Sequence, residues 1–160
     1  MPKKSARPEL TYPIVKGFLD YLIDERHFSQ YTSRCYGVDL RQFIAHVNDE
    51  SNLEFDADRE LAVWTRAQNG RADVVGSVGP NTFTDIVLAC EVEPIRSFLA
   101  HLADCKYSTA TMARKIATLR SFHKWLERTD VISRNPMTII RTPRQSRRLP
   151  KAITVADVEK

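Results

Sequence analysis

Cysteine and glycine are both scarce in this sequence. The three cysteines, Cys35, Cys90 and Cys105, form no C-x-x-C pair and leave one without a partner, which argues against a disulfide framework and against a zinc site. Glycine occupies 5 of 160 positions while 42% of the residues are hydrophobic, a balance that favours a helical globular protein with its own core. We therefore expect a metal-free protein of a reducing compartment, the cytoplasm.

Long apolar runs are absent as well. No stretch approaches the ~18 apolar residues that a membrane span requires, and the lysines near the start are not followed by the apolar segment of a secretory signal. The glycine-rich stretch 69–81 lacks the G-K-[ST] ending of a phosphate-binding loop. The sequence therefore predicts neither a membrane segment nor a nucleotide cofactor.

Negative charge is scarce outside one segment. Residues 49–93 contain ten acidic and three basic residues, whereas the rest of the chain contains ten acidic and 21 basic ones, so the formal charge of +4 hides a strong asymmetry. A basic body favours a polyanionic partner, because neutralised phosphates release condensed counterions. Charge counts alone leave simple solubility open as the alternative.

Apolar residues recur at helical spacing in five stretches, which predicts an all-α fold. The first stretch begins at Pro13, a favourable first helical residue. Ser29 and Ser108 stand where N-caps belong, before the second and the last stretch. The expected helices cover about residues 13–26, 30–48, 56–68, 93–104 and 108–128.

The last of these helices has a core face and a basic face. Ile116, Leu119, Phe122 and Leu126 fall on one side at 100° per residue, and the opposite arc holds basic residues without an acidic one among them. Arg34 and Arg41, seven residues apart, share an edge of the helix 30–48. Lys115 and Arg128 are interpreted as ordinary solvated charges. The arc consists of Arg114, Arg120, Lys124 and Arg128.

Two parts of the chain repeat one another. Leu and Phe follow the capping serine at eleven and fourteen residues in both copies, and a Thr follows it at three. The repeat predicts two helical hairpins of one design. Its matched groups are Phe18-Leu19-x-x-Leu22 with Phe98-Leu99-x-x-Leu102, Ser29-x-x-Thr32 with Ser108-x-x-Thr111, and Leu40-Arg41-x-Phe43 with Leu119-Arg120-x-Phe122.

The flanks differ in character from this repeated body. Residues 1–11 form a basic arm, interpreted as a flexible terminus with DNA contact as the alternative. Residues 134–152 form a basic linker; up to 151 it has six basic residues, three prolines and no acidic residue, so we expect it to run extended along something negative. Residues 153–160 resemble the capped start of a further, truncated domain.

These patterns resemble the amino-terminal half of the tyrosine recombinases, the Xer-type and phage integrase group. The segment from Phe18 to Phe43 is similar to the first hairpin of their SAM-like core-binding domain, and the segment from Phe98 to Leu126 to the second. Asn135-Pro136 and the basic segment after it resemble the junction to the catalytic domain. The resemblance implies a four-helix domain over residues 12–133. We expect the acidic segment, about 49–92, to be an insertion on the outer side, away from DNA.

The resemblance also implies a function. The family's domain clamps double-stranded DNA at inverted-repeat half-sites beside other recombinase subunits, with its second and fourth helices at the major groove. A tyrosine of the catalytic domain then cuts the strand through a phosphotyrosine. None of that catalytic set can be placed in this chain, whose tyrosines are interpreted as packing or helix-edge residues, so we expect DNA binding without cleavage. The candidate DNA contacts are Arg34, Arg41, Arg114, Arg120 and Lys124 on the helices and Arg144, Arg147, Arg148 and Lys151 on the linker.

Two other functions are compatible with the sequence. One is a stand-alone helical DNA-binding regulator or accessory factor, and the other is a helical protein-interaction module without a nucleic-acid role. Steep weakening of binding with salt would separate the DNA-binding functions from the last one.

Overall fold

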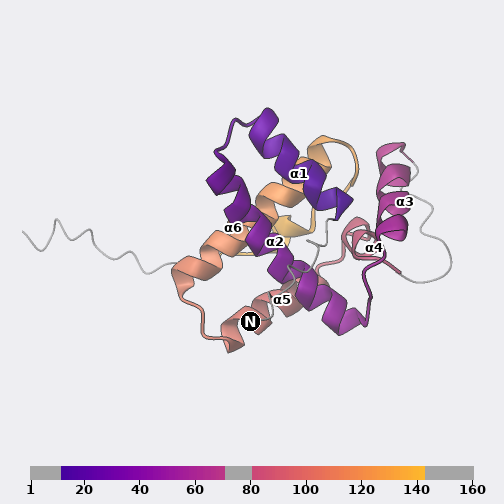
Figure 1. Ribbon diagram of the computed structural model, residues 1–160. Coiled ribbons are helices and arrows are strands. Elements are labelled where there is room, and N and C mark those ends of the chain that lie inside the picture. The colour runs from indigo at the N-terminus through magenta and orange to yellow at the C-terminus, as the bar shows by residue number, and fades with distance from the viewer. Residues whose placement is uncertain (1–11, 71–80, 143–160) are drawn as a thin grey trace, which may run out of the picture.

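The computed structural model describes residues 12–70 and 81–142, and within these ranges the chain is helical and contains no strand. The all-α expectation is confirmed. The elements are α1 (Pro13–Asp24), α2 (Gln30–Ser51), α3 (Ala57–Gln68), α4 (Phe83–Leu88), α5 (Glu93–Asp104), α6 (Thr109–Arg128) and the 3-10 turn η1 (Pro136–Ile139) (Figure 1).

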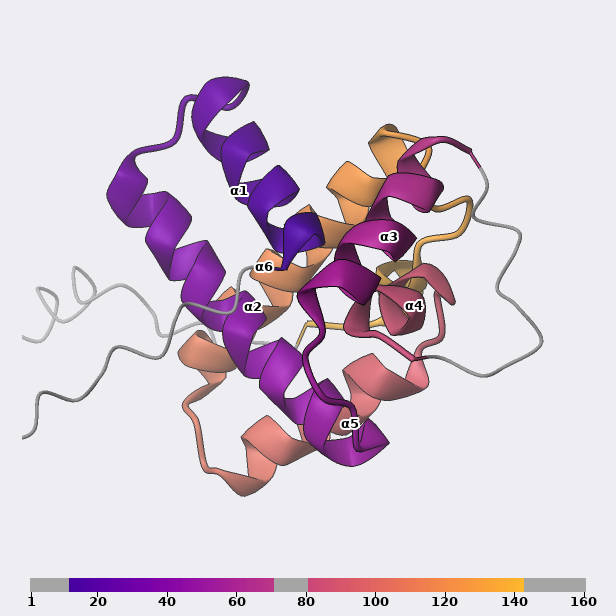
Figure 2. The ribbon, with the colours of Figure 1, turned by 45° about the vertical axis from the view of Figure 1, so that its right-hand side comes forward.

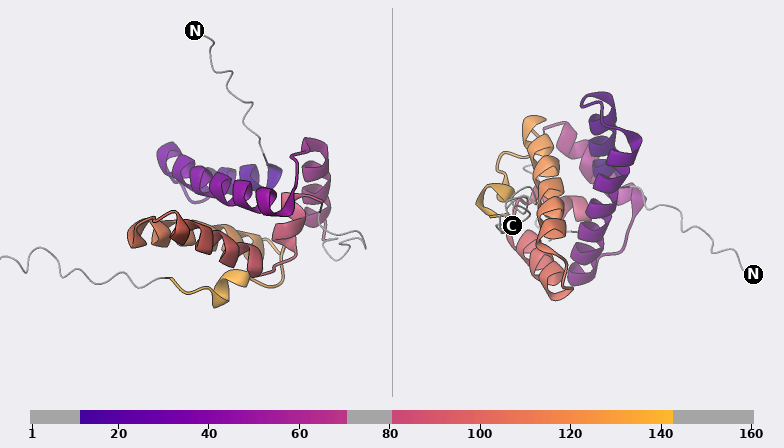
Figure 3. Two further views of the ribbon diagram at one scale, coloured as in Figure 1. Left: turned by 90° about the horizontal axis from the view of Figure 1, so that it is seen from below. Right: turned by 90° about the vertical axis from the view of Figure 1, so that its left-hand side faces the viewer.

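The helices form two layers closed at one end. α1 and α2 make the first hairpin and α5 and α6 the second, and α2 packs against both α5 and α6. Seen from below, the two hairpins lie one above the other, with α3 and α4 at one end of the sandwich (Figure 3, left). Figure 2 shows α3 and α4 beside each other on the side where α1 begins.

Both hairpins use the same capping and burial pattern. The hydroxyl oxygen of Ser29 accepts a hydrogen bond from the backbone N–H of Thr32, and that of Ser108 accepts one from Thr111, each at 3.1 Å. Each capping serine has extended backbone before a long helix. Four apolar residues of each copy are at most 3% exposed: Phe18, Leu22, Leu40 and Phe43 in the first copy and Phe98, Leu102, Leu119 and Phe122 in the second. The remaining repeated pair, Leu19 and Leu99, is partly buried in both copies.

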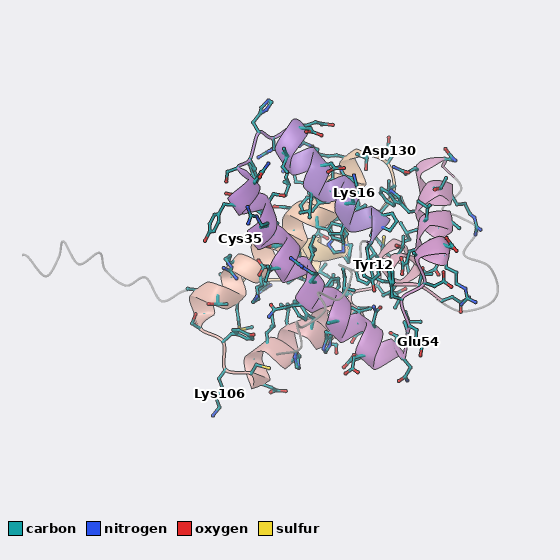
Figure 4. All side chains as sticks on the ribbon, in the orientation of Figure 1. Tyr12, Lys16, Cys35, Glu54, Lys106 and Asp130 are labelled. Atoms are coloured by element: carbon teal, nitrogen blue, oxygen red, sulfur yellow. The ribbon has the colours of Figure 1, made fainter. Side chains whose placement is uncertain are left out.

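The two helices inside the predicted insertion belong to the core. Trp64 of α3 is 6% exposed and its ring lies 5.7 Å from that of Trp125 on α6. Phe83 of α4 is 1% exposed and packs edge-on against Phe43 and against Tyr12. Figure 4 shows Tyr12 where the start of α1 approaches these helices. The expectation of an outer appendage is therefore wrong for α3 and α4.

A buried glutamate joins α3 to α4. Glu60, 2% exposed, accepts hydrogen bonds from the backbone N–H groups of Phe83 and Thr84, at 2.9 and 3.2 Å, and from the Thr84 hydroxyl at 2.5 Å. Burial raises the pKa of the Glu60 carboxyl, and the three donors oppose that rise. The next residue, Leu61, is 53% exposed although it is apolar. The core side of α3 is made by Glu60, Trp64 and Ala67.

After α6 the chain folds back instead of running extended. Asn135 caps η1 by accepting a hydrogen bond from the N–H of Met137 at 2.9 Å. Met137 and Ile140 are 3% and 7% exposed and join the core. The expectation of an extended linker is therefore wrong for its first residues, up to Thr142.

The helices in the described ranges are too short or too polar to cross a lipid bilayer.

Candidate nucleic-acid interface

The two helices with basic edges, α2 and α6, lie side by side. They pack against each other, and the view from the left of Figure 1 shows both along one side of the molecule (Figure 3, right). Each begins at a serine cap, which satisfies one of the free N–H groups of its first turn. This pair carries all five helical cations that the sequence singles out.

Arg34 and Arg41 lie together, as their seven-residue spacing predicts. Both are exposed, and both line a groove of about 330 Å³ between α1 and α2. Lys16 of α1, labelled in Figure 4, adds a third cation to the groove, although its ammonium is paired with Asp20 at 2.6 Å. Arg41 also donates from Nε to the carbonyl oxygen of Gly37 at 3.4 Å.

Arg114 is a residue of α6. It lies where α6 meets the edge of α2 that carries Asp39. Its side chain is 58% exposed, and Nη2 donates to Oδ1 of Asp39 at 3.1 Å. The guanidinium is thus held by a buried carboxylate while part of it stays in solvent. A planar guanidinium has five N–H donors, so one bond to Asp39 leaves donors for a phosphate.

Lys115 is not a solvated charge, and that interpretation is wrong. Its side chain is 3% exposed, and its ammonium donates to Oδ1 of Asp39 at 2.9 Å and to Oε1 of Gln42. Thr118 donates to the second carboxylate oxygen of Asp39 at 2.9 Å. Asp39 therefore binds three side chains of α6 and fixes the contact between the two helices. The basic face of α6 is consequently not free of acidic partners.

Arg120 and Lys124 have different environments although they are four residues apart. Lys124 is exposed. Arg120 is half-buried and donates to the carbonyl oxygen of Ile140 at 2.7 Å and to the hydroxyl of Thr142. The linker candidates Arg144, Arg147, Arg148 and Lys151 lie outside the described residues.

Two histidines far apart in the sequence, His46 and His101, come together between α2 and α5. The rings of His46 and His101 are 4.9 Å apart and stacked, and Nε2 of His46 lies 3.0 Å from the hydroxyl of Ser97. In the part of the chain that the structure describes, no group of three or more His, Cys, Asp or Glu side chains is placed to hold a metal ion.

Comparison with known protein families identifies this helical domain. The model of the phage integrase N-terminal SAM-like domain matches residues 15–69 and 84–130. The chain belongs to this family. The match runs through α3 and resumes within α4, so only residues 70–83 between its two parts lie outside it. This is a much shorter interruption than the expected insertion at 49–92.

Individual relatives of this SAM-like domain are recombinases. Tyrosine recombinase XerC of Listeria innocua serovar 6a is 31% identical over 144 residues, which cover 90% of this chain and 37% of the relative. Tyrosine recombinase XerD of Listeria monocytogenes serotype 4b is 31% identical over 147 residues, covering 92% and 39%. The chain thus spans little more than a third of these relatives' length. No solved structure gives a significant match.

Nothing in the sequence indicated the side chains on α2 that bind the cations of α6. Asp39 and Gln42 passed unnoticed because their partners lie more than 70 residues away in sequence. One signal was available for Lys115, which stands four residues before Leu119 and so falls on the core stripe of its helix. A lysine on that stripe requires a buried partner.

Proposed function

We propose that this SAM-like domain binds duplex DNA as the amino-terminal part of a site-specific tyrosine recombinase. One observation carries the proposal: the exposed cations Arg34, Arg41, Arg114 and Lys124 all lie on the packed pair α2 and α6. Arginine and lysine side chains on rigid helices are the usual phosphate-positioning groups of DNA-binding domains. The relatives named tyrosine recombinases support the same function.

In this proposal the domain grips DNA and residues outside the chain cut it. The domain would sit on one half-site of an inverted repeat beside other recombinase subunits. Its tyrosines take no part in strand cleavage. Tyr12 is 4% exposed and packed against aromatic rings. The hydroxyl oxygen of Tyr107 accepts a hydrogen bond from Nε2 of Gln42, and the ammonium of Lys115 lies over the Tyr107 ring. Tyr31, 75% exposed on α2, is available for contact with DNA.

Binding to a generic 30-base-pair duplex at increasing salt tests the proposal. We expect the logarithm of the affinity to fall with the logarithm of salt with a slope of about −5, the value for roughly six phosphate contacts. The double substitution Arg34→Ala and Arg41→Ala should make this slope shallower by about 2 units, since each contact contributes about 0.9. Fluorescence anisotropy measures both quantities.

Arg66→Ala is the matched control. Arg66 is exposed on α3, away from the α2 and α6 pair, so its loss should leave the slope unchanged. A flat salt dependence of the unsubstituted domain would contradict DNA binding and favour a protein-interaction module. An unchanged slope in the folded double variant would instead exclude the Arg34 and Arg41 edge as the binding surface.

A further inference from the structure

Arg120 forms a fork that holds the chain segment leaving the domain. Its two terminal nitrogens bind different acceptors: Nη1 donates to the hydroxyl of Thr142, and Nη2 donates to the carbonyl oxygen of Ile140 at 2.7 Å. The side chain is half-buried. Arg41, at the same place in the first repeat, is exposed. The two arginines thus occupy equivalent positions in the sequence repeat, but their environments in the fold differ.

The segment that Arg120 holds runs back along α6. Near the end of the helix, Nδ2 of Asn135 donates to Oε2 of Glu127 at 3.1 Å. The segment then buries Met137 and Ile140 and reaches Arg120. From Glu127 to Arg120 is seven helical residues, or about 10 Å along the axis. Figure 3 (left) shows η1 lying against the outer side of α6.

The fork determines where the chain leaves the domain. Without a return segment, the chain would depart from the end of α6 at Arg128. With Asn135 fixed at Glu127 and Thr142 fixed at Arg120, it departs beside the middle of α6 instead. The exposed Lys124 lies between these two fixed points on the same helix.

We propose that Arg120 is a positioning residue, which clamps Ile140 and Thr142 so that the basic residues after Thr142 start beside the middle of α6. That these residues then follow DNA rests on the function proposed above, whereas the clamp itself does not. The two hydrogen bonds of the clamp require an arginine side chain. A guanidinium can serve two acceptors in fixed directions, while a lysine keeps the charge but has a single ammonium and no planar fork.

Limited proteolysis of the DNA-free protein tests the clamp. Arg141 is exposed, but its neighbours Ile140 and Thr142 are both held by Arg120. We therefore expect trypsin to cut after Arg141 mainly when the segment opens, so that mass spectrometry of the Arg141–Thr142 cut reports opening. We expect Arg120→Lys to speed this cut about tenfold, because one charge-assisted hydrogen bond is worth roughly that factor in a local opening equilibrium. The cut after exposed Lys106, in the turn between α5 and α6, serves as the internal reference and should keep its rate.

Two further variants keep the test decisive. Lys124→Ala removes a cation from the same helix without touching the clamp and should leave the Arg141 cut unchanged. Thr142→Val keeps the shape of the side chain but removes one acceptor at the surface, and should speed the cut several-fold even if replacing Arg120 disturbs folding. An Arg141 cut at the unsubstituted rate in both Arg120→Lys and Thr142→Val would overturn the clamp. A failure of DNA binding would leave these rates untouched, so the two proposals fail separately.

Discussion

His123 is a buried titratable side chain on a helix that otherwise presents cations. It is 2% exposed, its Nδ1 lies 2.8 Å from the carbonyl oxygen of Leu119, and burial lowers its pKa to about 4. The unfolded chain therefore binds a proton at higher pH than the folded protein does. Stability from this group is complete above about pH 6.5 and is lost as the pH falls from there towards 4.

We expect this single histidine to cost about 3 kcal/mol of unfolding free energy between pH 7 and pH 4, since one pKa unit is worth about 1.4 kcal/mol. Urea denaturation of the unsubstituted protein and of His123→Met at both pH values measures the effect as a difference. Other titrating groups, including Glu60 with its raised pKa, cancel in that subtraction. An equal loss in both proteins would show that His123 does not drive the acid sensitivity.

Asp39 shows how one carboxylate organises several cations. It is 3% exposed and accepts from Arg114, Lys115 and Thr118, all on α6. A buried ion pair adds little net stability, because desolvation offsets the attraction, but an unpaired buried charge is costly. The network therefore favours one contact geometry between α2 and α6 over others. In doing so it fixes the position of the partly exposed Arg114.

At the scale of helices, the two serine caps are equivalent. Ser29 has φ −63° and ψ 154°, Ser108 has φ −63° and ψ 155°, and both accept from the N–H three residues later at 3.1 Å. We expect Ser29→Ala and Ser108→Ala each to lower the unfolding free energy by about 1 kcal/mol, the usual value of an N-cap. Chemical denaturation measures it.

Ser133→Ala is the control for the caps, because Ser133 is an exposed serine outside the helices. Its replacement should change stability by less than about 0.5 kcal/mol. A loss for Ser29→Ala no larger than this control would mean that the cap seen before α2 contributes nothing to folding.

The two repeats also meet at an equivalent position. Thr118 donates to Asp39 across 79 residues of sequence, the same offset that separates Ser108 from Ser29 and Phe122 from Phe43. Corresponding positions on α2 and α6 thus face each other at the centre of the domain. The chemistry at this contact is asymmetric, since one copy supplies a carboxylate and the other supplies a hydroxyl.

At the scale of the whole molecule, α3 and α4 are structural parts of the domain. The indole of Trp64 meets that of Trp125, and an added Cβ at Gly17 on α1 would lie 3.1 Å from Trp125 and 3.5 Å from Trp64. α3 therefore closes over the contact between α1 and α6. We expect Trp64→Ala to lower the unfolding free energy by about 3–5 kcal/mol, as large buried aromatics do.

Leu61→Ala provides the comparison on the same helix. Leu61 is 53% exposed, so its loss should cost less than about 0.5 kcal/mol. Both values come from chemical denaturation followed by circular dichroism. Equal, small losses for the two variants would indicate that α3 is detached from the core and would restore the interpretation of an outer insertion.

Much of the fold could be predicted from local signals. The expected helix 93–104 matches α5, and Ser29 and Ser108 cap the helices that they were predicted to cap. α4 was missed, since its six residues are too short for a helical period to register. α2 extends to Ser51, where Asn52 ends it with a left-handed backbone, φ 51°. Asparagine adopts this conformation more readily than most residues.

The sequence by itself determined the five longer helices, the two serine caps, the core face of α6 and the repeat, because each arises from interactions between residues a few positions apart. Only the tertiary structure decided whether an individual cationic side chain is exposed or is bound to a partner within the domain. Arg41 and Arg120 share one pattern, yet Arg120 binds Ile140 and Thr142 and Arg41 is exposed. Lys115 is buried against Asp39, 76 residues away. Such partners are joined by packing, and no local period or spacing records which distant group will fill the space beside a given side chain.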